Sequence, residues 1–254
     1  MKIFRSESFV DYKTYTFNYA TYCIKEDQSE LPEIYAQGFL PYSNNVNLQE
    51  ETYYLARSLR VDLSLFKESS ENRRVVRKME ELQPSLEVIP AKDFNLDDIE
   101  FKNYCLDFAS KRFSESISME RLDYILSAKS ISHIFQFKIA DKNVGYVISI
   151  IENGTLHYWF AFFDLEYQTY ALGKWMMFSV IKWAFEQKMA FVYLGTCYGE
   201  KSLYKVRDFK GLSYFDGNQW DSNIKTLKAK CKSDQEFTAD EFKQDTDLFL
   251  QRLL

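Results

Sequence analysis

The stretch IFQFKIADKNVGYVISIIENGTLHYWFAFF, residues 134–163, contains three short runs of apolar and aromatic side chains separated by polar residues. The runs cover residues 134–140, 144–151 and 156–163. Each has the length and the β-branched or aromatic composition of a strand. Asn153-Gly154, between the second and third runs, suits a tight turn with positive φ angles. These features predict an antiparallel meander of three strands.

The segment after the third predicted strand changes to helical spacing. A long apolar helix is expected from about Leu172 to Gln187, and the short run 191–194 that follows ends at Gly195. A strand, a helix and a second strand in this order form a βαβ unit. Three antiparallel strands that lead into one βαβ crossover match the core of the GNAT-like acyltransferase fold. We therefore expect an α/β protein of the α+β type, with a mixed sheet and this fold.

The part of the chain before this core predicts a strand followed by a helix. Within residues 53–66, apolar and polar side chains alternate from Ser58 to Leu65 with the period of two that is typical of a half-buried strand. Ser69 and Ser70 can cap a helix whose apolar side chains extend from Val75 to Leu82. The proline-containing stretch 83–94 interrupts the pattern, and we interpret it as a connection between two parts of the chain.

Helical spacing recurs on both sides of the predicted core. Stretches 101–108 and 122–126 predict two amphipathic helices before the meander. Stretches 223–231 and 240–253 predict two more after the crossover. The expected domains are residues 1–90, a strand and helix subdomain with a basic helix, and residues 91–254, a GNAT-like catalytic domain with C-terminal helices.

Composition restricts the class of protein. A chain of 254 residues with 46% hydrophobic and 17% aromatic residues can bury a large core. The formal net charge of −5 argues against indiscriminate nucleic-acid binding. Four widely spaced cysteines suggest neither a disulfide framework nor a zinc cluster, so no metal site is expected. No signal peptide or membrane-spanning run is evident, and the expected location is the cytoplasm.

The stretch Gln168-Thr-Tyr-Ala171-Leu-Gly173 lies where GNAT-type enzymes bind the pyrophosphate of an acyl-CoA, at the N-terminus of the crossover helix. Their usual pattern is Q/R-x-x-G-x-G/A, in which free backbone amides and the helix dipole hold the phosphates. This sequence keeps the first and last positions and has Ala171 where the middle glycine belongs. A second interpretation is that Gly173 only eases the entry into the helix.

Several stretches resemble the bacterial arginyl-tRNA-protein transferases in order and spacing. They are Tyr158-Trp-Phe-Ala-Phe-Phe163-Asp164, Ala171-Leu-Gly173, Tyr193-Leu-Gly195, Ser202-Leu-Tyr204-Lys205 and, in the first half, Ser70-Glu-Asn-Arg73-Arg74-Val-Val-Arg77-Lys78. The resemblance covers residues 32–82 and 145–220. The family carries cysteines before the Arg-rich stretch, and this chain has none at the corresponding residues 38–42.

The resemblance implies transfer of an aminoacyl group, with arginyl as one candidate, from tRNA to an amine on a protein or peptide, with no cofactor besides the aminoacyl-tRNA. Lys205 is then expected to stabilise the tetrahedral intermediate or the terminal phosphate, and Tyr204 to donate a proton or hydrogen bond near the leaving hydroxyl. Asp164 could hold a substrate ammonium group. The alternative for Lys205 and Tyr204 is an exposed lysine beside a half-buried tyrosine without a catalytic role. The alternative for Asp164 is a turn or cap residue.

The Arg-rich stretch is the candidate tRNA contact. Arg73, Arg74, Arg77 and Lys78 lie within two helical turns, with Arg57 and Arg60 on the strand before them, and could neutralise several phosphates; a solvated helix face is the alternative.

The two histidines, His133 and His157, fall in predicted strands, and His157 is interpreted as a packed or surface strand residue.

Three functions stay open on the sequence. They are an aminoacyl-tRNA-dependent transferase, an acyl-CoA-dependent N-acyltransferase and a catalytically silent tRNA- or ligand-binding protein on the same fold. The degenerate pyrophosphate motif and the Arg-rich helix favour the first. The amino acid carried, the acceptor and the oligomeric state are not determined by the sequence.

Overall fold

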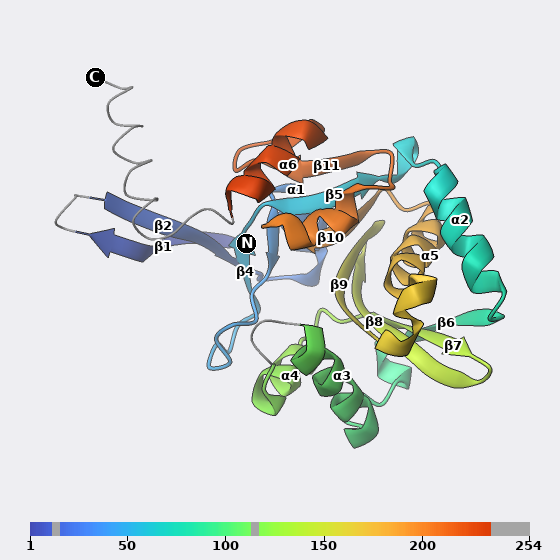
Figure 1. The fold of residues 1–254 in the computed structure, drawn as a ribbon. Helices are drawn as coiled ribbons and strands as arrows, with labels where there is room; N and C mark the ends of the chain where they lie inside the picture. The colour runs from blue at the N-terminus through green and yellow to red at the C-terminus, as the bar shows by residue number, and fades with distance from the viewer. Residues whose placement is uncertain (12–15, 113–116, 235–254) are drawn as a thin grey trace.

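A computed structural model describes residues 1–11, 16–112 and 117–234 and divides their strands between two sheets (Figure 1). The small sheet has the order β1-β2-β4-β3, and the large sheet has the order β12-β11-β5-β10-β9-β8-β7-β6. The small sheet consists of β1 (Lys2–Asp11), β2 (Thr16–Ile24), β3 (Phe39–Pro41) and β4 (Thr52–Leu55). The large sheet consists of β5 (Ser58–Asp62), β6 (Pro84–Pro90), β7 (His133–Ile139), β8 (Lys142–Glu152), β9 (Thr155–Phe163), β10 (Phe191–Thr196), β11 (Leu212–Phe215) and β12 (Trp220–Asp221).

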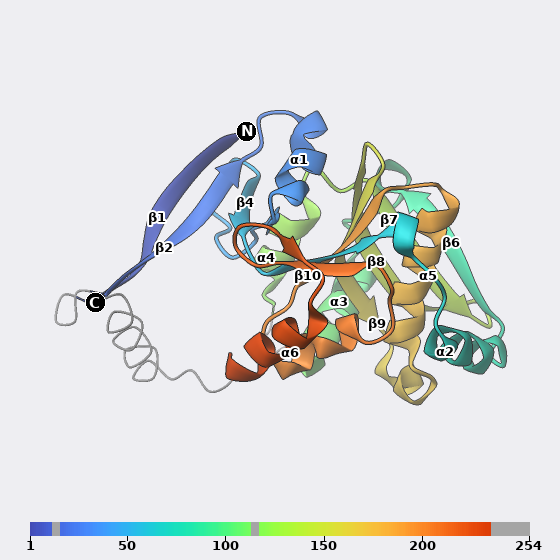
Figure 2. The same ribbon diagram turned by 90° about the horizontal axis from the view of Figure 1, so that it is seen from above.

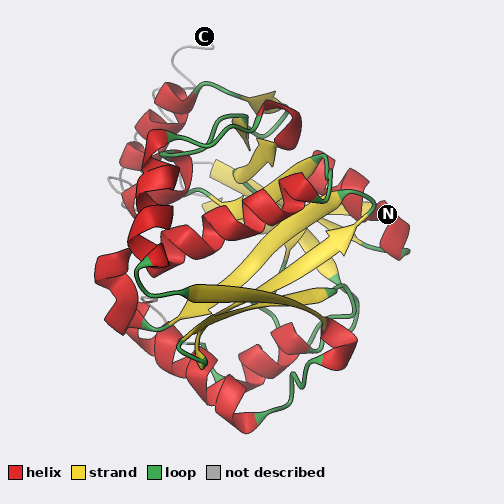
Figure 3. Ribbon diagram, turned by 90° about the vertical axis from the view of Figure 1, so that its right-hand side faces the viewer, coloured by secondary structure: helices red, strands yellow, loops and turns green. Residues whose placement is uncertain are grey.

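Helices cover both faces of the large sheet. The α-helices are α1 (Leu31–Ala36), α2 (Ser70–Glu80), α3 (Ile99–Arg112), α4 (Met119–Leu126), α5 (Leu172–Glu186) and α6 (Ile224–Ser233). Short 3₁₀ helices are η1 (Gln28–Glu30), η2 (Leu63–Leu65), η3 (Ala91–Asp93), η4 (Leu165–Tyr170) and η5 (Glu200–Val206). Helix α5 lies across one face of the sheet, as Figure 3 shows. None of the helices in the described part of the chain has the length and apolarity that crossing a membrane requires.

The predicted meander and crossover are confirmed. β7 pairs antiparallel with β8, and β8 with β9. β9 and β10 are parallel neighbours joined through α5. Positive φ angles at Asn153 and Gly154 close the turn between β8 and β9, as the Asn-Gly pair predicted. The mixed α/β architecture and the GNAT-like core therefore follow from the local patterns.

The proline-containing stretch differs from its prediction as a connection. It forms β6, which pairs along its whole length with β7, from Pro84 opposite Ile139 to Pro90 opposite His133. Because β6 is the last strand of the sheet, its prolines need no partner on the outer side. The division into residues 1–90 and 91–254 stays a prediction, and β5, α2 and β6 belong to the same sheet and core as the later strands.

The strand predicted from the alternation at residues 58–65 is confirmed as β5, which ends three residues before the pattern does. β4 joins the small sheet and β5 the large one, and the chain turns into η2 after Asp62. Helix α2 begins after Ser69, whose side chain accepts a hydrogen bond from the Asn72 amide in a capping box, so the predicted helix start is confirmed. The predicted helix at 223–231 is confirmed as α6, whereas the one at 240–253 lies outside the described residues.

Three apolar clusters hold these layers together. The first packs α2, α5 and α6 on one face of the large sheet. On the other face, a second cluster joins α3 and α4 to β7, β8 and β9, and a third joins α1 and the small sheet to Ile150 and Tyr193. Trp159 packs against both of these clusters, so it lies where the small sheet and the α3–α4 pair meet. The hairpin β1–β2 extends away from this body (Figure 2).

Candidate active site

Strands β9 and β10 run side by side over only part of their lengths. Three Cα pairs join them, the last being Tyr193 opposite His157. Beyond that pair β10 continues along β5, where Thr196 lies opposite Ser58. Residues 158–163 of β9 pair with β8 and, among the described strands, have no partner on the β10 side. The split between the two strands therefore offers backbone polar groups to a ligand.

Lys205 lies beside this split. It belongs to η5, and its ammonium Nζ donates a hydrogen bond of 2.9 Å to the carbonyl oxygen of Thr196 at the end of β10. A Cβ atom on Gly195 would stand 3.7 Å from that nitrogen. Burial lowers the pKa of Lys205 to about 8, although the nearby Cys197 thiol opposes the shift. At neutral pH the group stays mostly protonated and can give up its proton at modest cost.

His157 is the buried neighbour of this lysine. Its imidazole is 1% exposed, and Nδ1 lies 3.3 Å from the hydroxyl of Tyr35 on α1. Nε2 has no hydrogen-bond partner among the described residues. Burial first, and then the positive charge of Lys205, lower the pKa of His157 to about 3. A neutral, packed histidine agrees with the interpretation from the sequence, so Lys205 is the charged member of this pair.

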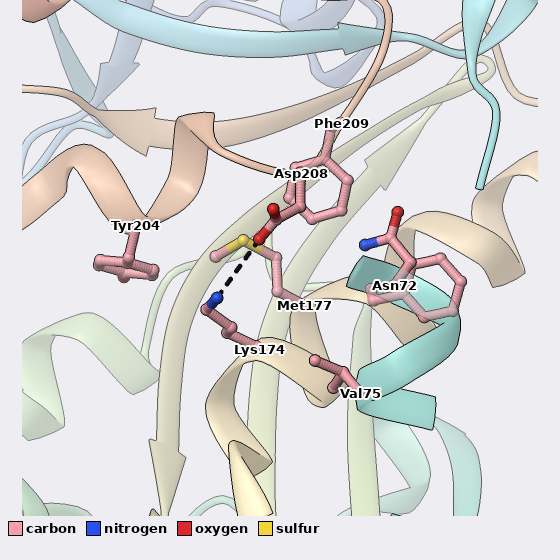
Figure 4. A pocket seen from close by; sticks show the side chains of 8 residues that line it. Asn72, Val75, Lys174, Met177, Tyr204, Asp208 and Phe209 are labelled. Atoms are coloured by element: carbon pink, nitrogen blue, oxygen red, sulfur yellow. Dashed lines mark hydrogen bonds and ion pairs between the residues drawn. The ribbon is translucent and has the colours of Figure 1, made fainter. Parts of the chain in front are cut away.

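Tyr204 stands next to Lys205 with its side chain 45% exposed. The Lys205 ammonium lies 5.9 Å from the centre of its ring. On its inner side the ring lines a crevice between η5, α2 and α5, in which Lys174 and Asp208 approach to 3.4 Å (Figure 4). The crevice has a volume of about 10 Å³, the space of one water molecule, so it holds no substrate. The open side of Tyr204 is the side available to a ligand.

Asp164 has a structural environment. Its side chain accepts a hydrogen bond from the Glu166 amide at 3.0 Å as the N-cap of η4, and it forms an ion pair of 2.8 Å with Lys142. Partial burial raises the pKa of Asp164, but the bonds from Lys142 and Glu166 outweigh it and lower the pKa. Both carboxylate oxygens thus have protein partners, as the cap alternative describes, and a role with a substrate ammonium stays a prediction.

The predicted phosphate loop lies at the N-terminus of α5. Gln168 lies within η4. Ala171 adopts the left-handed conformation with φ 62° and provides no side-chain cap for α5. A Cβ on Gly173 would stand 2.7 Å from the ring of Phe163. Gly173 is therefore needed for the close packing of α5 on β9. This role differs from the second interpretation of the sequence, in which Gly173 only eases the entry into the helix, and phosphate binding at this loop stays a prediction.

The four basic residues of α2 do not share one environment. Arg74 forms two hydrogen bonds of 2.7 Å with the Glu71 carboxylate, and Lys78 donates to the Thr169 carbonyl at 2.5 Å. Arg73 and Arg77 are exposed at i and i+4 on one face, and Arg73 also donates to the Glu68 carbonyl at 3.1 Å. Of the predicted tRNA contacts, this pair is directed to solvent.

Arg57 and Arg60 do not extend this basic surface as the sequence suggested. Arg57 binds Asp234 through two hydrogen bonds of 2.7 and 3.2 Å. The guanidinium of Arg60 lies between two rings, 4.1 Å from the centre of Trp220 and 4.4 Å from that of Phe191. Both cations are used in internal contacts. Strand alternation alone could not reveal this, because their partners are more than 100 residues away in the chain.

The sequence analysis missed the partners that define the environment of Lys205. The Thr196 carbonyl follows the Tyr193-Leu-Gly195 motif, but a backbone oxygen leaves no signal in the residue types. Lys174 carries a weak signal, since it immediately follows Gly173 in the first turn of α5. It bonds Glu71 at 3.5 Å and Asp208 at 3.4 Å, which links α2, α5 and the segment after η5.

Comparisons with known proteins agree with the topology. The family model described as Acetyltransferase (GNAT) domain matches residues 109–210, from the end of α3 to the segment after η5. No curated protein matches the chain.

Several solved structures are similar at low identity. L-PGS from Bacillus licheniformis is 15% identical, with 68% of this chain and 50% of that one covered and a TM-score of 0.40. FemX is 10% identical, with coverages of 68% and 61% and a TM-score of 0.43. The glucosamine N-acetyltransferase region of a fungal multi-domain GH3 β-N-acetylglucosaminidase is 10% identical, with coverages of 76% and 22% and a TM-score of 0.42.

The chain thus spans between about a fifth and three fifths of these solved chains. The matched domain contains β7 to β10, α5 and Lys205. With the observed meander and crossover, it confirms the prediction of a GNAT-like acyltransferase.

Proposed function

We propose that the protein transfers an aminoacyl group from a charged tRNA to an amine. The observation that carries this proposal is the placement of the Lys205 ammonium beside the split between β9 and β10, with the exposed Tyr204 next to it. The ordered motifs that resemble arginyl-tRNA-protein transferases end at this same pair of residues. The arginyl group is one possible cargo, and a protein or peptide is the proposed acceptor class.

The reaction begins with an unprotonated acceptor amine. It attacks the ester carbonyl carbon, a C–N bond forms, and the carbonyl electron pair moves to oxygen. The Lys205 ammonium lies where it can stabilise that oxyanion, which is the charge that develops in the transition state. The bond to the ribose oxygen then breaks, and the proton lost by the amine passes to this leaving oxygen. Tyr204 donates a hydrogen bond to it, and no redox cofactor takes part.

Acyl-CoA-dependent N-acylation is the second candidate. It is favoured by the GNAT domain match and by the N-terminus of α5, where Ala171 provides no side-chain cap. Against it, the one cation of the first turn, Lys174, is already bound to Glu71 and Asp208. Two carboxylates near a helix N-terminus oppose the binding of a pyrophosphate.

The deciding experiment offers the purified protein tRNA charged with one labelled amino acid at a time, together with a peptide pool, and counts label in acid-stable product. Acetyl-CoA with the same acceptors is the parallel reaction. We expect label from one or a few aminoacyl-tRNAs and none from acetyl-CoA. Transfer from acetyl-CoA alone would favour the second candidate, and the absence of both would favour a binding protein without catalytic activity.

The pH dependence of transfer should report the protonation of Lys205. With an acceptor whose amine is unprotonated throughout the tested range, kcat/KM should fall as pH rises through about 8, because the ammonium form stabilises the oxyanion. Lys205→Arg, which stays charged, should move this decline to higher pH even if its maximal rate is lower. A profile with the same decline in Lys205→Arg would assign the decline to another group.

The exposed pair on α2 should contribute to tRNA affinity through phosphate contacts. We expect Arg73→Glu/Arg77→Glu to weaken tRNA binding by at least tenfold and to reduce the slope of log K against log [salt] by about 2. The matched control is Lys228→Glu/Lys232→Glu, the same i and i+4 charge reversal on exposed positions of α6. Equal effects of the two double variants would show that only net charge matters and would remove α2 from the interface.

A further inference from the structure

A cavity of about 620 Å³ lies apart from Lys205, where the small sheet meets α4 and β9. This volume is in the range of small-molecule binding sites. The residues that line it come from the segment after β2, from β3, from β4 and the segment before it, from α4 and the segment after it, and from Trp159 on β9. Trp159 packs against the apolar cluster that contains Tyr35, and His157 contacts Tyr35, so both side chains lie on the face of the sheet toward the small sheet. The cavity and the split between β9 and β10 therefore share a wall.

Aromatic side chains form much of this lining. They are Tyr42, Tyr53, Tyr124 and Trp159. Tyr42 packs edge-on against Tyr54 at 5.9 Å between ring centres, and Trp159 is held by Phe160 at 5.3 Å, so the rings have supporting neighbours. Faces of tyrosine and tryptophan attract organic cations when the surroundings exclude water.

The charged groups of the lining favour a cation as well. Four carboxylates, Glu26, Asp27, Glu50 and Glu51, stand against two ammonium groups, Lys25 and Lys129. Lys25 forms an ion pair with Glu51, whose other oxygen accepts a hydrogen bond of 2.9 Å from the Ser130 amide. Glu26 pairs with Lys2 at 3.0 Å and with the Met1 ammonium at 2.8 Å. The remaining carboxylates of the lining, Asp27 and Glu50, then exceed the remaining ammonium group, Lys129, by one negative charge.

We propose that this cavity binds the acceptor through an organic cation, an alkylammonium group of the kind carried by a lysine side chain or a small polyamine, while a second amine of the same molecule, unprotonated, is the nucleophile. The role as acceptor site rests on the proposed transferase function, whereas the recognition of a cation does not. The aromatic faces contact the alkyl chain and the charge, Glu50 balances the ammonium group, and Trp159 directs the bound molecule along β9 toward Lys205.

Direct binding of a charged and a neutral peptide tests the proposal without any tRNA. The probes are acetyl-Ala-Lys-Ala-amide and the same peptide with the lysine Nε acetylated, compared by calorimetry at low and high salt. We expect the charged peptide to bind at least tenfold more tightly and to weaken with salt. Cadaverine as a third probe separates the sources, because binding tighter than that of the peptide indicates a small polyamine.

Two cavity variants locate the site. Glu50→Gln should weaken binding of the charged peptide about threefold, and Tyr124→Leu, which keeps apolar volume and removes the ring face, about fivefold. Glu33→Gln is the control, because Glu33 is an exposed carboxylate on α1 that does not line the cavity. Thermal unfolding of each variant establishes that it is folded.

The outcomes separate this proposal from the transferase function. Equal binding of both peptides, binding of neither at millimolar concentration, or no difference between the cavity variants and Glu33→Gln would overturn the cation site. Charge-dependent binding without transfer from any aminoacyl-tRNA would keep the cation site and reject the proposed function. Transfer with charge-independent binding would reject the cation site alone.

Discussion

Lys205→Met should reduce kcat/KM for aminoacyl transfer by about 10²- to 10³-fold in a protein that stays folded. The substitution keeps the length of the side chain and removes the ammonium group that bonds the Thr196 carbonyl at 2.9 Å. The loss should appear mainly in kcat, since an interaction made with the oxyanion is absent in the ground state. Transfer is measured with the aminoacyl-tRNA that proves active when charged tRNAs are tested one at a time.

The same variant should be more stable than the unsubstituted protein at pH 7. The pKa of Lys205 is about 8 in the folded protein and 10.5 as a model value, so the unfolded chain binds more protons between these pH values. Burial of the charged Lys205 ammonium therefore lowers the free energy of unfolding by its full amount below pH 8. This destabilisation disappears as pH rises toward 10.5. Removing the ammonium should raise the free energy of unfolding at pH 7 by about 2 kcal/mol. This value is smaller than the full pKa shift would give, because the side chain is partly exposed to solvent.

Lys201→Met is the matched control for both effects. Lys201 is an exposed lysine of the same 3₁₀ helix, η5, and should change neither transfer nor stability appreciably. Urea unfolding at pH 7 and at pH 10 measures the pH dependence, and the stability gain of Lys205→Met should shrink at the higher pH. Unchanged transfer by Lys205→Met would remove Lys205 from the mechanism. A lower stability of Lys205→Met at pH 7 would contradict the destabilising effect of the buried charge.

Gly173→Ala should destabilise the protein by about 1–3 kcal/mol. The new Cβ would stand 2.7 Å from the Phe163 ring, which is itself packed against Phe108 at 4.7 Å between ring centres. Phe163 contacts the apolar clusters on both faces of the sheet, so its displacement affects α3 as well as α5. For a chain of this size the melting temperature should fall by roughly 3–10 °C.

A double-mutant cycle distinguishes packing from ligand binding at this position. If the ring is the obstacle, Gly173→Ala should cost less in a Phe163→Leu background, because leucine leaves room beside α5. An equal cost in both backgrounds would contradict the steric explanation. Weaker binding of acetyl-CoA or tRNA by Gly173→Ala at a temperature where it is fully folded would instead restore the role in phosphate binding.

Local pattern was sufficient for most elements of the large sheet. Alternation and the Asn153-Gly154 turn predicted the meander, and helical spacing predicted α2, α5 and α6, because these signals act over a few residues. Prolines misled the prediction at β6, since an edge strand tolerates them and edge position is a property of the whole sheet. The strand predicted from the alternation at residues 58–65 is confirmed as β5, but it ends at Asp62 because residues 63–65 form η2.

The candidate site shows the same division. Motif order selected Tyr204 and Lys205 together, and the structure brings Lys205 to the end of β10. The basic stretch on α2 was recognisable, but the structure alone reveals that Arg74 and Lys78 have internal partners while Arg73 and Arg77 face solvent. Ion pairing depends on which side chains meet across the fold, and residue types do not record this.

By itself, the sequence determined the order of the elements from β7 to β10, the βαβ crossover and the motif that ends in Lys205, because each depends on short-range periodicity or spacing. Only the tertiary structure decided that Gly173 serves packing and that β9 and β10 separate after Tyr193. Only the tertiary structure showed that the segment before β4, helix α4 and Trp159 together line the cavity. The physical reason is that burial, charge pairing and empty volume arise from contacts between residues far apart in the chain.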